Sequence, residues 1–170
     1  RPTVLYAPTW SPESSLNRVG VELIEHLLQR PINLIVKLHD RSMVPHPKYT
    51  ENVDWPRRLA RFQGRPRYAF ATGAHAGPYL AAADAMITDH STIGFEFALL
   101  DRPLVIFDAP ELLSFARINR DKWDLLRGMA DIARGVHELP DVLSRALEAP
   151  ERHTAARRAA SQALFAFAGQ

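Results

Sequence analysis

Short apolar runs of strand length recur along this chain and constrain its fold more than any other feature. The clearest is "INLIVKL" at Ile32–Leu38, which is interrupted only by Asn33 and Lys37. Nearly continuous runs of this kind are typical of strands that are buried on both faces of a parallel sheet. Comparable runs occupy residues 3–7, 67–71, 85–88 and 104–107, and a weaker one lies near 131–136.

Segments of helical periodicity separate these runs. Val19, Leu23 and Leu27 recur at helical spacing, Ser14 or Ser15 can cap the helix, and Pro31 stops it. We expect further helices near 55–62, 78–83, 92–100, 120–127, 139–147 and 150–168, with a loop over 40–54 and a turn at 110–115. The alternation predicts an α/β fold, a Rossmann-like doubly wound parallel sheet of about six strands.

Length and composition set the class of protein. With 170 residues, the chain is predicted to form one domain, residues 1–170. Cysteine is absent, which excludes disulfides and thiolate metal sites and fits a cytoplasmic location. No apolar run approaches the length of a membrane span. Because the chain opens at Arg1 without Met, we expect a longer protein, with the last helix packing toward a missing N-terminal domain.

The charge is small overall but uneven. A formal net charge of +2 argues against a nucleic-acid partner. The stretch "RRLARFQGRPR" at 57–67 nevertheless carries five Arg in eleven residues. This stretch is either the solvated face of a helix plus a turn or a patch that faces a phosphate-rich polymer or anionic lipid, the latter at the inner face of the plasma membrane.

In a doubly wound sheet, ligands bind beyond the carboxyl ends of the strands. The segment "ITDHSTIGFEF" at 87–97 lies at such an end. Asp89, His90 and Ser91 are consecutive and therefore cannot converge as a catalytic triad. The histidines show no spacing typical of a metal site, so we predict none.

Anion binding is the better interpretation of this segment. Ser91 and Thr92 fall where a helix begins, and backbone N–H groups there favour phosphate, although Ser and Thr also cap helices without any ligand. Glu96, further along the helix, is either solvated or an acceptor for a ribose diol. Lys37 and His39 alternate in their strand and point the same way, so both can reach a phosphate.

Three motifs occur together in a familiar order. They are "VLYAPTW" at 4–10, "KLHD" at 37–40 and "YLAAADAMITDHSTIGFEFALLDRPLVIFD" at 79–108. This pattern resembles the CDP-glycerol glycerophosphotransferase family, which includes teichoic-acid primases and polymerases. The resemblance implies the C-terminal, donor-binding half of a GT-B transferase that makes a cell-surface polymer, either teichoic-acid-like or a capsular polysaccharide.

The resemblance also implies roles for individual residues. His39 is the catalytic residue that engages the donor diphosphate. The donor-binding set is Lys37, Thr9, Asp89, His90, Ser91, Thr92 and Glu96. Asp40 stands where many members have Pro, and His90 where many have Tyr. The family's H-G-T-P-x-K motif is absent, so we expect the isolated chain to be inactive.

The expected donor is CDP-glycerol or a nucleotide sugar, and the acceptor is a polymer or a lipid-linked molecule. No cofactor is required, and Mg²⁺ accompanying the donor diphosphate is compatible with the site. Two alternatives stay open: half of an enzyme like the UDP-sugar 2-epimerases, and a non-catalytic module that binds nucleotides or anions.

Overall fold

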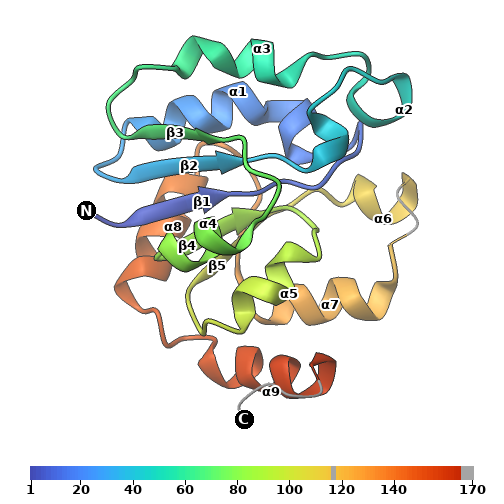
Figure 1. The fold of residues 1–170 in the computed structure, drawn as a ribbon. Helices are drawn as coiled ribbons and strands as arrows, with labels where there is room; N and C mark the ends of the chain where they lie inside the picture. The colour runs from blue at the N-terminus through green and yellow to red at the C-terminus, as the bar shows by residue number, and fades with distance from the viewer. Residues whose placement is uncertain (116–117, 166–170) are drawn as a thin grey trace.

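Six parallel strands form one sheet in the order β3-β2-β1-β4-β5-β6 in the computed structural model, which describes residues 1–115 and 118–165 (Figure 1). The strands are β1 (Thr3–Tyr6), β2 (Asn33–Lys37), β3 (Tyr68–Ala71), β4 (Ala85–Thr88), β5 (Leu104–Phe107) and β6 (Asp131–Ala133). The predicted α/β fold with six parallel strands is confirmed. The chain adds β2 and β3 on one side of β1, and then crosses back to add β4 on the other side. The strand order therefore reverses at the neighbouring strands β1 and β4.

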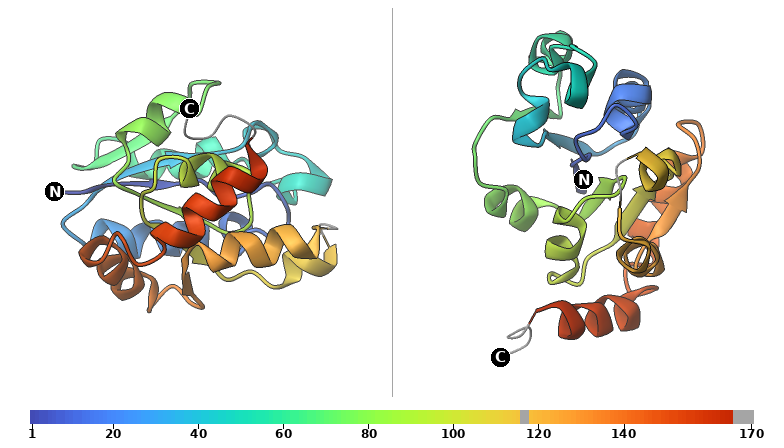
Figure 2. Two further views of the ribbon diagram at one scale, coloured as in Figure 1. Left: turned by 90° about the horizontal axis from the view of Figure 1, so that it is seen from below. Right: turned by 90° about the vertical axis from the view of Figure 1, so that its right-hand side faces the viewer.

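The helices cover both faces of the sheet (Figure 2). They are α1 (Ser15–Leu28), α2 (Pro47–Thr50), α3 (Trp55–Leu59), α4 (Gly77–Ala82), α5 (Ile93–Ala98), α6 (Glu111–Phe115), α7 (Arg120–Gly128), α8 (Leu139–Glu148) and α9 (Thr154–Leu164). Two short 3₁₀ helices, η1 (Asp40–Ser42) and η2 (Ala60–Phe62), complete the set. No helix in the described ranges has the length and apolar character needed to cross a membrane.

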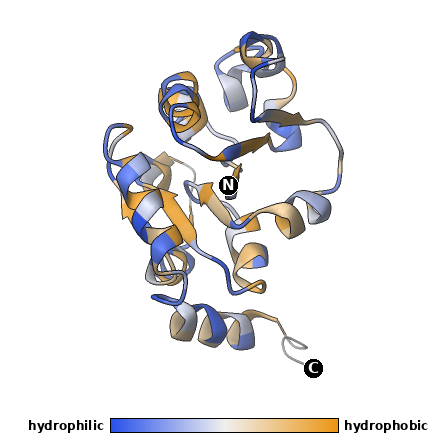
Figure 3. Cartoon of the chain, turned by 90° about the vertical axis from the view of Figure 1, so that its left-hand side faces the viewer, coloured by the Kyte–Doolittle hydropathy of each residue, from blue (hydrophilic) through white to orange (hydrophobic). Residues whose placement is uncertain are grey.

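Alternate residues of β1, β2, β4, β5 and β6 pack in different cores, which explains why these runs are largely apolar. In the edge strand β3, Ala69 is exposed. Val4 and Tyr6 of β1 pack in the core beneath α1, α3 and α8. Leu5 packs on the other face, in the core formed with α4, α5, α7 and α9. Figure 3 shows the central strands as largely hydrophobic, whereas the helices carry both colours. The sheet is therefore buried on both faces, as its sequence pattern requires.

Helix α1 forms where its sequence predicts. Ser14 is the N-cap and accepts a hydrogen bond from the Asn17 N–H at 3.4 Å. Leu23, Ile24 and Leu27 are fully buried on the face toward the sheet. The helix therefore begins beside the carboxyl ends of the strands and ends at the opposite edge.

Two predictions for irregular segments are wrong in part. The predicted loop over 40–54 contains η1 and α2, because His39 and His46 cap these short helices through their Nδ1 atoms. The predicted turn at 110–115 contains α6. Histidine caps are hard to foresee, since Ser, Thr, Asp and Asn dominate this position.

The C-terminal helix α9 packs against α5 and lies at the edge of the molecule (Figures 1 and 2). Its Arg157 is 1% exposed, and its guanidinium donates to Asp101 Oδ1 at 2.9 Å and to the Pro150 carbonyl at 2.6 Å. Residues 166–168 of the predicted helix lie outside the described residues. The packing of this helix toward another domain stays a prediction.

We expect Asp101→Asn to destabilise the fold by about 3 kcal/mol, because it leaves the buried Arg157 guanidinium without its carboxylate. Asp101 has a φ of 49°, which Asn tolerates, so the backbone should be retained. Urea unfolding measures the loss. Arg158→Ala is the matched control: Arg158 also pairs with Asp101, at 3.1 Å, but is 71% exposed and should contribute less than about 1 kcal/mol. Equal losses in the two variants would contradict the assignment.

Candidate functional site

A cavity of about 260 Å³ lies at the carboxyl ends of β1, β2 and β4, beside the point where the strand order reverses. This is the position at which doubly wound sheets bind ligands. Its lining consists of Ala7, Pro8, Lys37, Leu38, His39, Asp40, Ala74, Ala76, Ser91, Thr92, Ile93 and Glu96. The structure thus brings together five of the eight residues predicted from the sequence, which are Lys37, His39, Ser91, Thr92 and Glu96.

Lys37 supplies a buried positive charge to this pocket. The side chain is 8% exposed, and its ammonium donates to the Leu38 carbonyl at 2.9 Å. Among the residues described, no carboxylate forms a salt bridge with it. A buried ammonium that is hydrogen-bonded to only one carbonyl can still donate to an anion in the pocket.

His39 presents a donor to the same space. Its Nδ1 accepts the Arg41 backbone N–H at 3.1 Å, which places the proton of the neutral ring on Nε2. Loss of solvent around the ring lowers the pKa of His39, and the charges of Arg41 and Lys37 act in the same direction against the opposing effect of Asp40. His39 is therefore a neutral hydrogen-bond donor near pH 7.

An aromatic cluster that the sequence did not predict lies beside His39. The Trp10 ring is 6.0 Å from the His39 ring and 5.1 Å from the Tyr49 ring. The Arg41 guanidinium lies over Trp10, 4.1 Å from the ring centroid. Trp10 stands in the predicted motif "APTW", and His39 in "KLHD". The other two partners, Arg41 of η1 and Tyr49 of α2, come from the segment predicted as a loop.

The remaining three predicted residues, Thr9, Asp89 and His90, do not line the pocket. Asp89 is 1% exposed. Its Oδ1 accepts the backbone N–H groups of Thr9 at 2.7 Å and His90 at 2.8 Å. Its Oδ2 accepts the backbone N–H of Ser15 at 2.9 Å and the Ser15 hydroxyl at 2.8 Å. These contacts give Asp89 a positioning role beneath the pocket, and Thr9 takes part through its backbone.

Tyr6 extends this buried network. Because the Ser15 hydroxyl donates to Asp89, it accepts from the Tyr6 hydroxyl, 2.9 Å away. Burial raises the pKa of Tyr6 well above its usual value, and the nearby charge of Asp89 adds to the shift. Tyr6 therefore remains protonated and holds the start of α1 against β1.

His90 packs away from the pocket against α7. Its ring stacks on Trp123 with centroids 5.0 Å apart and planes 11° apart. Its buried Nε2 finds no hydrogen-bond partner within the described chain. Burial lowers the pKa of His90, so the neutral ring is the form that the fold prefers.

The pocket contains two carboxylates, Asp40 and Glu96. In the described part of the chain they are not members of any group of three His, Asp or Glu side chains that could share an ion. Glu96 is exposed on α5 and is positioned to accept hydrogen bonds from a polar ligand.

We expect Asp89→Asn to destabilise the fold by about 3 kcal/mol. The asparagine side chain has no charge, and its NH₂ group would face N–H and O–H donors that need an acceptor. Chemical denaturation measures the change. Asp124→Asn, which alters an exposed α7 carboxylate, should stay within about 0.5 kcal/mol of the parent. A small effect at Asp89 would mean that the four hydrogen bonds do not organise this edge of the sheet.

The free energy of unfolding should fall as the pH decreases through about 6.5, the ordinary pKa of histidine. Below that value the unfolded chain binds a proton at His90 that the folded chain resists, so protonation favours unfolding. His39 acts in the same direction. We therefore expect His90→Phe, which keeps a ring on Trp123, to reduce the loss between pH 7.5 and 5.5 without abolishing it. An unchanged loss, measured by urea unfolding at both pH values, would contradict this role.

Comparison with known proteins gives the family and the fold of the chain. A family model described as CDP-Glycerol:Poly(glycerophosphate) glycerophosphotransferase matches residues 1–169. The teichoic acid glycerol-phosphate primase of Bacillus subtilis (strain 168) is 30% identical in an alignment of 107 residues that covers 61% of this chain and 25% of the primase. The chain thus spans about a quarter of that relative.

Solved structures show the same fold. A structure of the wall teichoic acid polymerase TagF, soaked with CDPG, superposes with a TM-score of 0.62 at 16% identity, over 95% of this chain and 37% of that one. Sucrose-phosphate synthase from Thermosynechococcus elongatus gives a TM-score of 0.61 at 16% identity, over 96% and 41% of the two chains. With the family model matching almost every residue, this chain belongs to the CDP-glycerol:poly(glycerophosphate) glycerophosphotransferase family.

Proposed function

We propose that this chain is the donor-binding domain of a GT-B transferase that builds a cell-surface polymer from CDP-glycerol. Membership of the family supports transfer of glycerol phosphate. The likeness to a primase and a polymerase of teichoic acid supports a polymer or a lipid-linked molecule as acceptor. The chain covers 25% of the primase and 37% of the polymerase, so the proposal concerns a longer enzyme in which this chain would form the donor-binding half of the GT-B fold.

The observation that carries the proposal is the buried Lys37 ammonium in a pocket that also contains two hydroxyl groups. Ser91 and Thr92 line the pocket with Lys37, and His39 adds an Nε2–H donor. A diphosphate offers acceptor oxygens to all four groups and balances the lysine charge. Glu96, an acceptor in the same lining, suits the ribose diol of the nucleotide.

The proposed reaction is attack by an acceptor hydroxyl on the β-phosphorus of CDP-glycerol. The bond from this phosphorus to the bridging oxygen breaks, and CMP leaves with the electron pair. Negative charge therefore develops on the leaving phosphate, where Lys37 and His39 stabilise it as fixed donors. The base that takes the hydroxyl proton would come from the remainder of the enzyme, so the isolated chain should bind donor without turnover.

Mg²⁺ is not required for this chemistry, since Lys37 already supplies positive charge. A Mg²⁺ ion that arrives with the donor would be held mainly by the phosphate oxygens and water, as is common for this ion. The acceptor and the location are also part of the proposal. The exposed Arg57, Arg58, Arg61 and Arg65 form a basic patch that suits peripheral binding at the anionic inner face of the plasma membrane.

Calorimetry should detect binding of CDP-glycerol and CMP to the chain, with weaker binding of UDP and UDP-sugars. His39→Ala and Ser91→Ala should each weaken CDP-glycerol binding by about 1.5–3 kcal/mol, which is roughly 10- to 150-fold in Kd, because each removes a hydrogen bond to a charged phosphate. Adding EDTA should change the affinity little.

Ser114→Ala is the control for these variants, because Ser114 is exposed on α6 and does not line the pocket. Its affinity should equal that of the parent. Tighter binding of UDP-sugars than of CDP-glycerol would favour an enzyme that uses nucleotide sugars. Binding to vesicles containing phosphatidylglycerol without binding to any nucleotide would refute the donor-binding role.

A further inference from the structure

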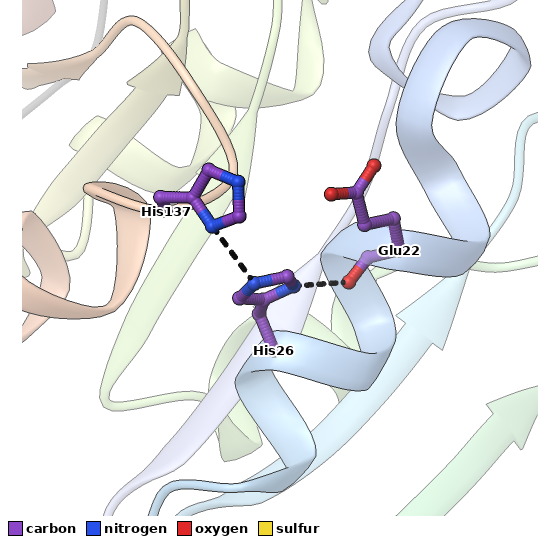
Figure 4. Close-up of side chains that lie close together, drawn as sticks. All are labelled: Glu22, His26 and His137. Atoms are coloured by element: carbon purple, nitrogen blue, oxygen red, sulfur yellow. Dashed lines mark hydrogen bonds between the residues drawn. The ribbon is translucent and has the colours of Figure 1, made fainter.

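Three potential metal ligands lie close together between α1 and the segment before α8 (Figure 4). Glu22 and His26 are four residues apart on α1, so they lie on the same side of that helix. His137 approaches from the segment between β6 and α8. One ligand atom from each residue lies within 4.8 Å of the other two.

The two imidazoles already have the spacing of ligands that share one ion. His26 Nε2 lies 3.2 Å from His137 Nδ1. Two nitrogens bound at 2.0–2.1 Å to a tetrahedral Zn²⁺ ion are about 3.3 Å apart. The same distance is that of a hydrogen bond between the two rings. An ion would replace this hydrogen bond, which requires the His137 ring proton to move from Nδ1 to Nε2 and the two rings to turn toward a shared point.

The tautomer of His26 also suits a ligand. Its Nδ1 lies 2.9 Å from the Glu22 carbonyl, which can only accept a hydrogen bond. The ring proton is thus fixed on Nδ1 and the lone pair of Nε2 points toward His137. Histidines that bind metals are commonly held in this way, by a backbone carbonyl on the other ring nitrogen.

We propose that Glu22, His26 and His137 bind a divalent transition-metal ion of the Zn²⁺ or Ni²⁺ type, with water in the remaining coordination positions. Two imidazoles and one carboxylate favour these ions over Mg²⁺ and Ca²⁺, which prefer sets of oxygen ligands. Glu22 and His137 are exposed, so an ion has direct access to the site.

The site is independent of the proposed donor-binding role. His26 lies eleven residues along α1 from Ser15, about 16 Å at the rise of an α-helix. A bound ion would join α1 to the segment that leads into α8. Arg30, two residues after the end of α1, already forms a salt bridge of 2.8 Å with Asp141 of α8. Its expected effect is to stabilise the folded chain by mass action rather than to take part in catalysis.

Titration of the metal-free chain, with any affinity tag removed, tests the site. Calorimetry with Zn²⁺ should give one ion per chain, and Zn²⁺ should raise the Tm where Mg²⁺ does not. His26→Gln and His137→Gln should each weaken Zn²⁺ binding by at least about tenfold, because each removes a direct ligand. Glu22→Gln should weaken it less, since the amide oxygen remains a neutral ligand.

His75→Gln is the matched control, because His75 is exposed and lies outside the cluster. It should bind Zn²⁺ like the parent. In EDTA all variants should have the Tm of the parent, which separates loss of a ligand from loss of folding. Parental Zn²⁺ affinity in both His26→Gln and His137→Gln, or an equal loss in His75→Gln, would overturn the proposal. Nucleotide binding should be unaffected throughout, so failure here leaves the donor-binding proposal intact.

Discussion

The buried carboxylate of Asp89 is the constraint on which the rest of this edge of the sheet depends. A carboxylate at 1% exposure is costly unless its oxygens accept hydrogen bonds, and here four donors from three residues satisfy it. Thr9 follows β1, Ser15 begins α1 and His90 follows β4. One side chain therefore joins the two strands between which the sheet order reverses, and fixes the start of the first helix between them.

This use of Asp89 determines what remains for a ligand. Both carboxylate oxygens of Asp89 accept hydrogen bonds from the protein, and Asp89 forms no salt bridge with Lys37, which is buried at the end of β2. Ser91, two residues further along the same loop, lines the pocket instead. Consecutive residues of one loop thus serve two different ends: Asp89 holds the scaffold, and Ser91 and Thr92 face the space where an anion would bind. Gly94 lets α5 pack closely against α7, since a Cβ there would lie 2.8 Å from Leu126 Cδ1 and the Leu126 side chain would have to shift.

The sequence predicted what depends on local pattern. Buried strands and the convergence of Lys37 and His39 follow from periodicity and from one-residue alternation. The cap of α1 was predicted as Ser14 or Ser15, and the structure has Ser14. Contacts between residues that are far apart in the chain could not be predicted from the sequence. Two of the three residues that donate to Asp89, Thr9 and Ser15, lie 80 and 74 residues earlier in the chain. His26 and His137 are 111 residues apart. The histidine cap of α2 was not predicted either, because the sequence of this segment is equally typical of a polar loop.

His90 shows how position decides the meaning of a residue. Among the neighbouring Asp89, Ser91 and Thr92 it looked like part of a site, and its role could not be assigned from the sequence. In the fold its ring turns to Trp123 on α7, and stacking at 5.0 Å gives it an apolar contact that any flat aromatic ring can make. A Tyr, which many family members have at this position, would preserve that contact. His90 therefore couples the loop after β4 to α7 through packing. The side chains that face the pocket are others, among them Lys37 and Ser91.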